Sequence, residues 1–198
     1  LNYPNLNNNL YNNFWPADVH MIGKDILRFH AVYWPAFLMA AGLEPPKQIF
    51  AHGWWTNEGQ KISKSLGNVI DPYEIIDQFG LDQIRYFLFR EVPFGNDGDF
   101  SKNAIATRVN ADLSNNYGNL VQRILTFIVK NCNASLDPKN NINAADQKLL
   151  DNFEKKYYDY SKSMDNNEID KALKSIMELL SITNAYVDEQ APWSLKKT

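Results

Sequence analysis

Residues 18–53 read DVHMIGKDILRFHAVYWPAFLMAAGLEPPKQIFAHG, and this stretch decides the fold of the first part of the chain. A short apolar run, 19–22, ends at Gly23 and is followed by a longer apolar stretch, 26–39, and by a second short run, 48–51. These lengths predict a buried strand, a helix and a second buried strand. Strand, helix and strand in succession form a right-handed crossover with parallel strands. We therefore expect half of a nucleotide-binding sheet.

The next part of the chain, residues 54–100, is rich in turn signals. The run Asp71-Pro72-Tyr73-Glu74 carries an acidic N-cap, a proline at the first helical position and a glutamate at the third, which predicts a helix start. We expect this helix to end at Gly80 and a second short helix to follow over 82–91. The cluster Gly95-Asn96-Asp97-Gly98 then breaks the chain, and a domain boundary is expected there.

From Ser101 onward the pattern is helical. Apolar residues recur at spacings of three and four, which predicts one long helix over about 101–131. Two more amphipathic stretches, 145–164 and 168–190, are joined by short polar loops, so they are expected to be antiparallel neighbours in a bundle. The expected fold class is therefore an α/β half of a Rossmann-like parallel sheet followed by an α-helical bundle, predominantly helical overall. The Asn-rich segment 1–13 lacks periodicity and is expected to be a surface loop.

Composition narrows the class of protein. With 44% hydrophobic residues in 198, the chain can bury a core. Its longest apolar stretch, 36–41, is far shorter than the roughly 20 residues of a membrane span, and its start has no signal-peptide pattern, so we expect a cytoplasmic protein without membrane association. The single Cys132 excludes an intrachain disulfide and a Cys-rich zinc knuckle within these residues. A net charge of -3 argues against broad nucleic-acid binding but permits a local basic patch.

One loop places two lysines three residues apart. The run Lys61-Ile62-Ser63-Lys64-Ser65 has glycines at 59 and 67, which let the loop move. When a carboxylate attacks the α-phosphate of ATP, such lysines can stabilise the charge that develops on the departing pyrophosphate. A bare Lys-x-x-Lys pair is more often a solvated basic turn, because so short a motif has a high false-positive rate.

The wider context favours the catalytic interpretation. The run from Lys61 to Ser65 resembles the KMSKS signature of class I aminoacyl-tRNA synthetases, with Ile62 in place of Met, a volume-conserving change. Other runs look like the methionyl members of that family: Trp15-Pro16-Ala17-Asp18, Gly23-Lys24-Asp25, Phe29-His30, Phe50-Ala51-His52-Gly53 and Glu91-Val92-Pro93-Phe94-Gly95. The resemblance covers residues 13–193. It implies an enzyme that activates methionine with ATP to methionyl-adenylate and transfers it to tRNA(Met).

The resemblance also implies a division into three parts. Residues 1–53 would be the C-terminal half of the catalytic nucleotide-binding domain, 54–100 the signature loop with the region that contacts the tRNA stem, and 101–198 a truncated helical anticodon-binding domain. The other signature of the class, a HIGH-type sequence, is absent from these residues. We therefore expect a fragment that is inactive alone. The alternatives are a class I synthetase for another amino acid and a non-catalytic tRNA-binding module.

Candidate ATP-binding residues follow the two strands. Gly23 and Asp25 come after the first strand, at the sheet edge where ligands bind in open α/β folds. The residues alone leave two roles open for Asp25, because an aspartate there can accept from ribose hydroxyls or cap a helix. The resemblance implies that Gly23 and Asp25 bind the ribose and that the backbone of Gly53 contacts adenine.

The resemblance gives the lysines their roles as well. Lys64 would be the main catalytic group and an ATP ligand, and Lys61 would support it on the pyrophosphate. ATP would arrive with Mg²⁺. No zinc ligands are expected in these residues.

Four further residues have two interpretations each. His30 is either a core histidine or, as the resemblance implies, part of the methionine pocket. Asn119 and Arg123 lie one helical turn apart, and both side-chain types can read unstacked bases. Trp193 is either an apolar lid on the bundle or a platform for a base. The resemblance implies that Asn119, Arg123 and Trp193 form the tRNA anticodon site.

Overall fold

The computed structural model describes residue 7 and residues 9–136 and 141–195, without the side chains of Lys64 and Leu195. The chain divides into two compact units. The first contains Leu1–Lys61 and Gly95–Asp99, and the second contains Ile62–Phe94 and Phe100–Thr198. The three-part division expected from the sequence stays a prediction.

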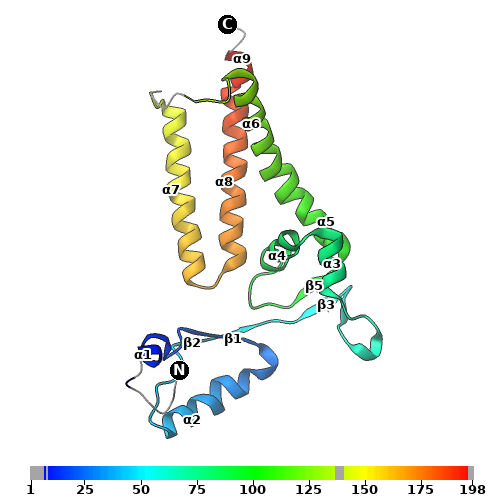
Figure 1. Cartoon of the computed structure of the whole chain (residues 1–198), viewed down its shortest axis with the longest axis vertical. Helices are drawn as coiled ribbons and strands as arrows, with labels where there is room; N and C mark the ends of the chain where they lie inside the picture. The colour runs from blue at the N-terminus through cyan, green and yellow to red at the C-terminus, as the bar shows by residue number, and fades with distance from the viewer. Residues whose placement is uncertain (1–6, 8, 137–140, 196–198) are drawn as a thin grey trace. The chain divides into compact units, whose positions relative to one another are not determined.

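The first unit is built on two parallel strands (Figure 1). Strand β1, Val19–Gly23, pairs with β2, Gln48–His52, in a register that sets Gly23 opposite His52. The connection contains a 3-10 turn η1, Lys24–Ile26, a π-helical turn η2, Phe29–Tyr33, and helix α2, Trp34–Ala40. The predicted order of strand, helix and strand is confirmed.

Two sequence signals explain how the connection between the strands begins and ends its helix. Pro35 lies in the first turn of α2, directly after the π-helical turn η2, and it has no N–H to donate to the preceding turn. Gly42 follows the helix with a φ of +70°, a conformation that glycine adopts without strain. Leu38 of α2 and Ile22 of β1 are both buried.

A second small sheet has the order β4-β3-β5. Strands β3, Trp55–Asn57, and β4, Gln60–Lys61, form an antiparallel hairpin whose turn residues Glu58 and Gly59 both have positive φ. Strand β5, Gly98–Phe100, lies on the other edge. The sequence predicted only turns here, because strands of two or three residues are too short to show alternation.

The expectation of a surface loop over 1–13 is wrong where the structure tests it. Helix α1 runs over Asn9–Phe14, and the Trp15 N–H donates to the Tyr11 carbonyl at 2.8 Å. A helix of 6 residues is too short to show a period. The residues 1–6 and 8 lie outside the described part of the chain.

The second unit is helical (Figure 1), and this confirms the predicted bundle. A 3-10 turn η3, Lys64–Leu66, precedes the helices. These are α3, Pro72–Phe79; α4, Leu81–Arg90; α5, Lys102–Arg108; the π-helical segment η4, Val109–Gly118; α6, Asn119–Asn131; α7, Ala144–Asp165; α8, Ile169–Gln190; and α9, Pro192–Leu195. The predicted N-cap of α3 is confirmed, because the Asp71 carboxylate accepts the Tyr73 N–H at 2.8 Å.

The core of the second unit is small and centred on α4. Phe87 of α4 and Ile105 of α5 are fully buried, and the Phe87 ring meets Phe100 edge to face at 5.8 Å. Helix α8 packs on α4 and α7, and its Ala172 is fully buried. A buried alanine lets neighbouring backbones approach closely.

Helices α5, η4 and α6 follow one another without a break, as the predicted helix over 101–131 requires. The middle segment η4 is π-helical, however, which the apolar period did not reveal. Its Asn116 holds it to α8: the side-chain amide donates to the Met177 carbonyl and the Ser181 hydroxyl, each at 3.0 Å. In return, Asn184 donates to the Asn116 side-chain oxygen at 3.0 Å.

Candidate functional site

The first candidate site lies at the carboxyl edge of β1 and β2. Gly23 and His52 are paired at the ends of these strands, so the residues that follow each strand come together at one edge. In open α/β sheets this edge is where ligands bind. The ring nitrogen Nδ1 of His52 is 2.9 Å from the carbonyl oxygen of the next residue, Gly53. This contact indicates a local structural role for His52.

Asp25 carries an exposed carboxylate at this edge. It lies in the first turn of η1, whose N-cap is Gly23, so it does not cap that turn. Its Oδ1 is 2.6 Å from the place where a Cβ on residue 23 would stand. Any side chain at position 23 would therefore displace the Asp25 carboxylate. This is a physical reason for a glycine at this position. The ribose role predicted for both residues is compatible with this geometry and stays a prediction.

Lys24, which lies between Gly23 and Asp25 in the sequence, is held by two groups that are distant in sequence. Its Nζ contacts both carboxylate oxygens of Asp97 at 2.6 Å and lies 4.2 Å from the centre of the Trp54 ring. Asp97 also accepts the Trp54 backbone N–H at 2.8 Å. The hydrogen bond from Lys24, and then that from Trp54, hold the pKa of the Asp97 carboxyl below its usual range.

Gly53 is buried, and it packs against the backbone of Asn96 and Asp97. A Cβ on this residue would lie 2.1 Å from the Asn96 carbonyl oxygen, so no other residue fits without moving the chain. Close packing therefore explains this glycine by itself. The predicted contact of its backbone with adenine stays a prediction.

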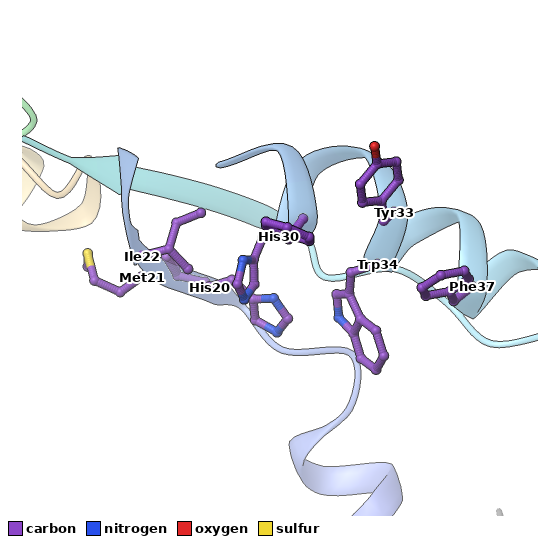
Figure 2. Close-up of a pocket in the computed structure, with 9 residues that line it drawn as sticks. His20, Met21, Ile22, His30, Tyr33, Trp34 and Phe37 are labelled. Atoms are coloured by element: carbon purple, nitrogen blue, oxygen red, sulfur yellow. The ribbon is translucent and has the colours of Figure 1, made fainter. Parts of the chain in front are cut away.

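An aromatic pocket of about 780 Å³ lies along the same strand (Figure 2). His30 of η2 lines it, with its Nδ1 3.1 Å from the Ile26 carbonyl oxygen. The other lining residues are Val19, His20, Met21, Ile22, Phe29, Tyr33, Trp34 and Phe37. This wall is mostly apolar, which suits a thioether side chain. The structure places His30 at a pocket, and its contact with methionine stays a prediction.

His20 of β1 is a pocket residue that the sequence analysis did not single out. Its ring meets His30 edge to face at 6.3 Å (Figure 2). Among the described residues, its buried Nδ1 has no hydrogen-bond partner. A histidine inside a short apolar run carries no local signal of function, so only the fold reveals it.

The two lysines of the signature loop are described unequally. Lys61 ends β4, and its Nζ lies 5.9 Å from the centre of the same Trp54 ring that faces Lys24. Lys64 begins η3, but its side chain lies outside the described part of the chain. The loop after Lys61 is locally ordered, because the Asn68 side chain accepts the Ser63 N–H at 2.8 Å. The catalytic roles of both lysines stay predictions.

The second candidate site lies in the second unit, where three sequence-predicted residues meet. Asn119 and Arg123 of α6 and Trp193 of α9 line one cavity of about 470 Å³. The Arg123 guanidinium carbon stands 5.3 Å from the centre of the Trp193 ring, in a cation–π arrangement. The ring is 43% exposed, so part of its surface is open to solvent. The remaining lining residues are Gln122, Thr126, Phe127, Lys130 and Asn131.

An acidic residue in the same place was missed by the sequence analysis. Asp188 of α8 accepts a hydrogen bond from Nη2 of Arg123, from a position 65 residues away in sequence. The ion pair fixes the guanidinium beside the Trp193 ring. An aspartate near a helix end has many roles, so nothing local indicates this one.

Two kinds of feature are absent from the described residues. None of the described helices is long and apolar enough to cross a membrane. No group of three or more His, Cys, Asp or Glu side chains in the described ranges is arranged to hold a metal ion.

Comparison with protein families gives two matches. The model described as tRNA synthetases class I (M) matches residues 2–125. The model described as the anticodon binding domain of methionyl tRNA ligase matches residues 138–198.

Curated relatives and solved structures agree with these models. The chain is 55% identical over 192 residues to the methionine–tRNA ligase of Rickettsia conorii, covering 95% of this chain and 38% of that protein. It is 51% identical over 185 residues to that of Brucella suis biovar 1, covering 93% and 36%. It superposes on Mycobacterium tuberculosis methionyl-tRNA synthetase in complex with methionyl-adenylate with a TM-score of 0.95 and 47% identity, covering 100% of this chain and 39% of that one. The chain thus spans less than two fifths of the length of these relatives.

Proposed function

Because the chain belongs to the class I tRNA synthetases of the methionyl type, we propose that it supplies part of the machinery of a methionine–tRNA ligase. The reaction joins methionine to ATP as methionyl-adenylate and then transfers the amino acid to tRNA(Met). The proposed place of action is the cytoplasm.

The observation that carries the proposal is the order of features along β1. The aromatic pocket uses Val19 to Ile22 of this strand, and the exposed Asp25 carboxylate lies two residues after its last residue, Gly23. An aminoacyl adenylate has the same two parts, an apolar side chain and a nucleoside with ribose hydroxyls. A relative 47% identical to this chain has been solved with methionyl-adenylate bound, which supports the assignment.

The chain's residues would divide the first step as follows. Asp25 accepts hydrogen bonds from the ribose hydroxyls, and the pocket at His30 holds the methionine side chain and excludes polar competitors. The methionine carboxylate forms a bond to the α-phosphorus of ATP, and the bond from that phosphorus to pyrophosphate breaks. Lys61 and Lys64 stabilise the leaving pyrophosphate, whose Mg²⁺ enters with ATP as part of the substrate.

The cavity at Trp193 would serve the second substrate. A flat, half-exposed indole can stack with an unpaired base, and the nearby guanidinium and amide of Arg123 and Asn119 can hydrogen-bond to base edges. The Arg123–Asp188 ion pair limits the conformations of the guanidinium before a base arrives. We propose that these three residues read the tRNA anticodon.

The full-length protein provides the test. We expect exchange of labelled pyrophosphate into ATP that depends on methionine, and not on cysteine, valine or leucine. Exchange driven by one of those amino acids would instead identify another class I synthetase. A protein that binds tRNA(Met) without any exchange would be a binding module, and the proposal would be wrong.

A further inference from the structure

A five-residue segment, Gly95–Asp99, returns from the middle of the chain to the first unit. The sequence pattern there, Gly95-Asn96-Asp97-Gly98, predicts only a chain break and a domain boundary. In the structure Asp97 accepts hydrogen bonds from residues at the candidate ATP site, and Asp99 accepts them from the hairpin that carries Lys61. This is more than a connecting turn requires.

Asp97 joins the two loops that follow β1 and β2. One of its partners, Lys24, comes directly after β1, and the other, the backbone N–H of Trp54, comes after β2. The Trp54 ring is in turn 4.2 Å from Lys24, and its Nε1 is 3.5 Å from the Asp25 carboxylate. One carboxylate therefore sets the spacing between the Gly23–Asp25 loop and the residues that follow Gly53.

Asp99 makes the equivalent connection to the hairpin that carries Lys61. Its Oδ1 accepts the Thr56 hydroxyl at 2.5 Å and the Gly59 N–H at 2.7 Å, so it holds both β3 and the turn. The hydrogen bond from Thr56, and then that from Gly59, lower the pKa of the Asp99 carboxyl. Lys61 follows this turn by two residues at the end of β4.

The segment packs directly against Gly53. Its Asn96 carbonyl occupies the space of a side chain at that position, and its Gly98 N–H donates to the Trp54 carbonyl at 2.8 Å. Gly95 starts the segment with a φ of +106°, which favours glycine there. Backbone packing and two carboxylates thus fix the same segment independently.

We infer that Gly95–Asp99 is a clamp of the ATP site, and that Asp97 and Asp99 are positioning residues for methionine activation. The clamp holds the loop that carries the proposed ribose ligand, Asp25, in a set relation to the hairpin that carries Lys61. The inference rests on the proposed function, because it assigns the two aspartates to the same reaction.

The clamp should affect the binding of ATP and not that of methionine. Its contacts reach the residues proposed for ATP, whereas the pocket at His30 is built from β1, η2 and α2 and contains none of Gly95–Asp99. Loosening the clamp should therefore raise the KM for ATP and lower kcat, with the KM for methionine nearly unchanged. A misplacement of about 1 Å can cost up to about 10²-fold in rate, so effects of about 10- to 100-fold are expected.

The experiment is methionine-dependent pyrophosphate exchange with the full-length protein. Asp97→Asn and Asp99→Asn remove the charges and keep the size, and both variants should lower kcat/KM for ATP by about 10-fold or more. Glu168→Gln is the matched control. It breaks an exposed ion pair between Glu168, the N-cap residue of α8, and Lys171 in the first turn of that helix. The control should behave as the wild type.

Two further measurements separate positioning from folding. Active-site titration gives the fraction of competent enzyme, so a loss through misfolding lowers that fraction and leaves both KM values alone. Asp97→Glu retains the carboxylate and should recover part of the lost activity even if Asp97→Asn folds poorly. Unchanged ATP kinetics in the two Asn variants, or equal changes in both KM values, would overturn the clamp. An inactive wild-type protein would instead overturn the proposed function.

Discussion

Tyr86 shows how strongly a single residue is held in the second unit. Its hydroxyl donates to Asp112 at 2.7 Å, and that carboxylate also faces Arg90 and Arg108, each at 3.5 Å. Burial, and then the hydrogen bond to Asp112, raise the pKa of the Tyr86 phenol far above its usual range. The phenol therefore stays protonated in the folded protein at pH values where it ionises in the unfolded chain.

The sign of the resulting pH dependence follows from this raised pKa. The stabilisation is fully present below the ordinary tyrosine pKa of about 10 and is lost as pH rises above it. Tyr86→Phe should therefore be less stable than wild type at pH 8, and the difference should narrow above pH 10. Urea unfolding at both pH values measures it. Tyr73→Phe, which alters a ring that is 78% exposed, is the control and should leave the pH dependence unchanged.

Lys64 is the residue with the largest expected effect on chemistry. Lys64→Ala in the full-length protein should lower kcat for adenylation by about 10²–10³, because it removes a charge that stabilises the transition state. The KM for methionine should barely change. Pyrophosphate exchange gives both constants. A variant with normal kcat and weaker ATP binding would show that the lysine binds ground state and transition state equally.

Substitution of Trp193 should affect the two half-reactions differently. Stacking of a base on an aromatic ring contributes about 1–3 kcal/mol, so Trp193→Ala should weaken aminoacylation of tRNA strongly. Adenylation without tRNA should be nearly unaffected. Arg123→Ala should act likewise and reduce discrimination against altered anticodons. If Trp193→Ala lost both half-reactions equally, the ring would be a structural part of the bundle.

At the residue level the sequence predicted the second site better than the first. Asn119 and Arg123 share a helix face, and their local spacing was enough to place them together. The partners of Lys24 are 30 and 73 positions away, and no local period connects them. Long-range contacts of this kind depend on the completed fold.

At the level of elements, η4 is the feature with the clearest consequence for α6. A π-helical stretch has more residues per turn than an α-helix, so it changes the direction in which the following helix presents its side chains. Asn119 begins α6 directly after η4. The hydrogen bonds between Asn116 and α8 therefore help to set where Asn119 and Arg123 point.

This gives a prediction for Asn116→Ala. The variant leaves the polar groups of Ser181 and Asn184 with fewer partners, so the protein should lose about 1–3 kcal/mol of stability. Aminoacylation should weaken more than adenylation, because the α6 face is displaced. Chemical unfolding and the two activity assays measure these effects. Asn115→Ala, at the exposed neighbouring position, is the control; a variant of Asn116 that matched it would disprove the role.

Element prediction succeeded where an element was long or had strong end signals. The strands on either side of α2, the N-cap of α3 and the antiparallel pair α7 and α8 all carried such signals. Helix α1, the β3–β4 hairpin and the π-helical segment did not. They are short, or they are fixed by contacts with distant residues such as Asp99 and Asn184.

At the scale of the whole molecule, these 198 residues would supply one side of the proposed active site. The ATP and methionine residues proposed here all follow or line β1 and β2, and the chain has no HIGH-type sequence. A polypeptide of only these residues should therefore not support methionine-dependent pyrophosphate exchange, because adenylation needs both substrates held in one geometry. Exchange at the rate of the full-length protein would contradict this expectation.

The family assignment was also within reach of the sequence. The lysine-bearing loop and the runs around it identified the class and its methionyl type before any fold was known, and the family models agree over 2–125 and 138–198. Short motifs achieve this because catalysis fixes residue type and spacing more tightly than folding does. The boundaries between the parts of the chain depend on packing, which motifs do not encode.

The position of Trp54 would make the proposed ATP site optically observable. The ammonium groups of Lys24 and Lys61 lie 4.2 and 5.9 Å from the centre of its half-exposed indole ring. Indole emission is sensitive to nearby charge, so a shift of either lysine toward a phosphate changes the field at this ring. Trp54, which follows β2, is therefore an intrinsic fluorophore placed to report a displacement of Lys61, the first residue of the signature run.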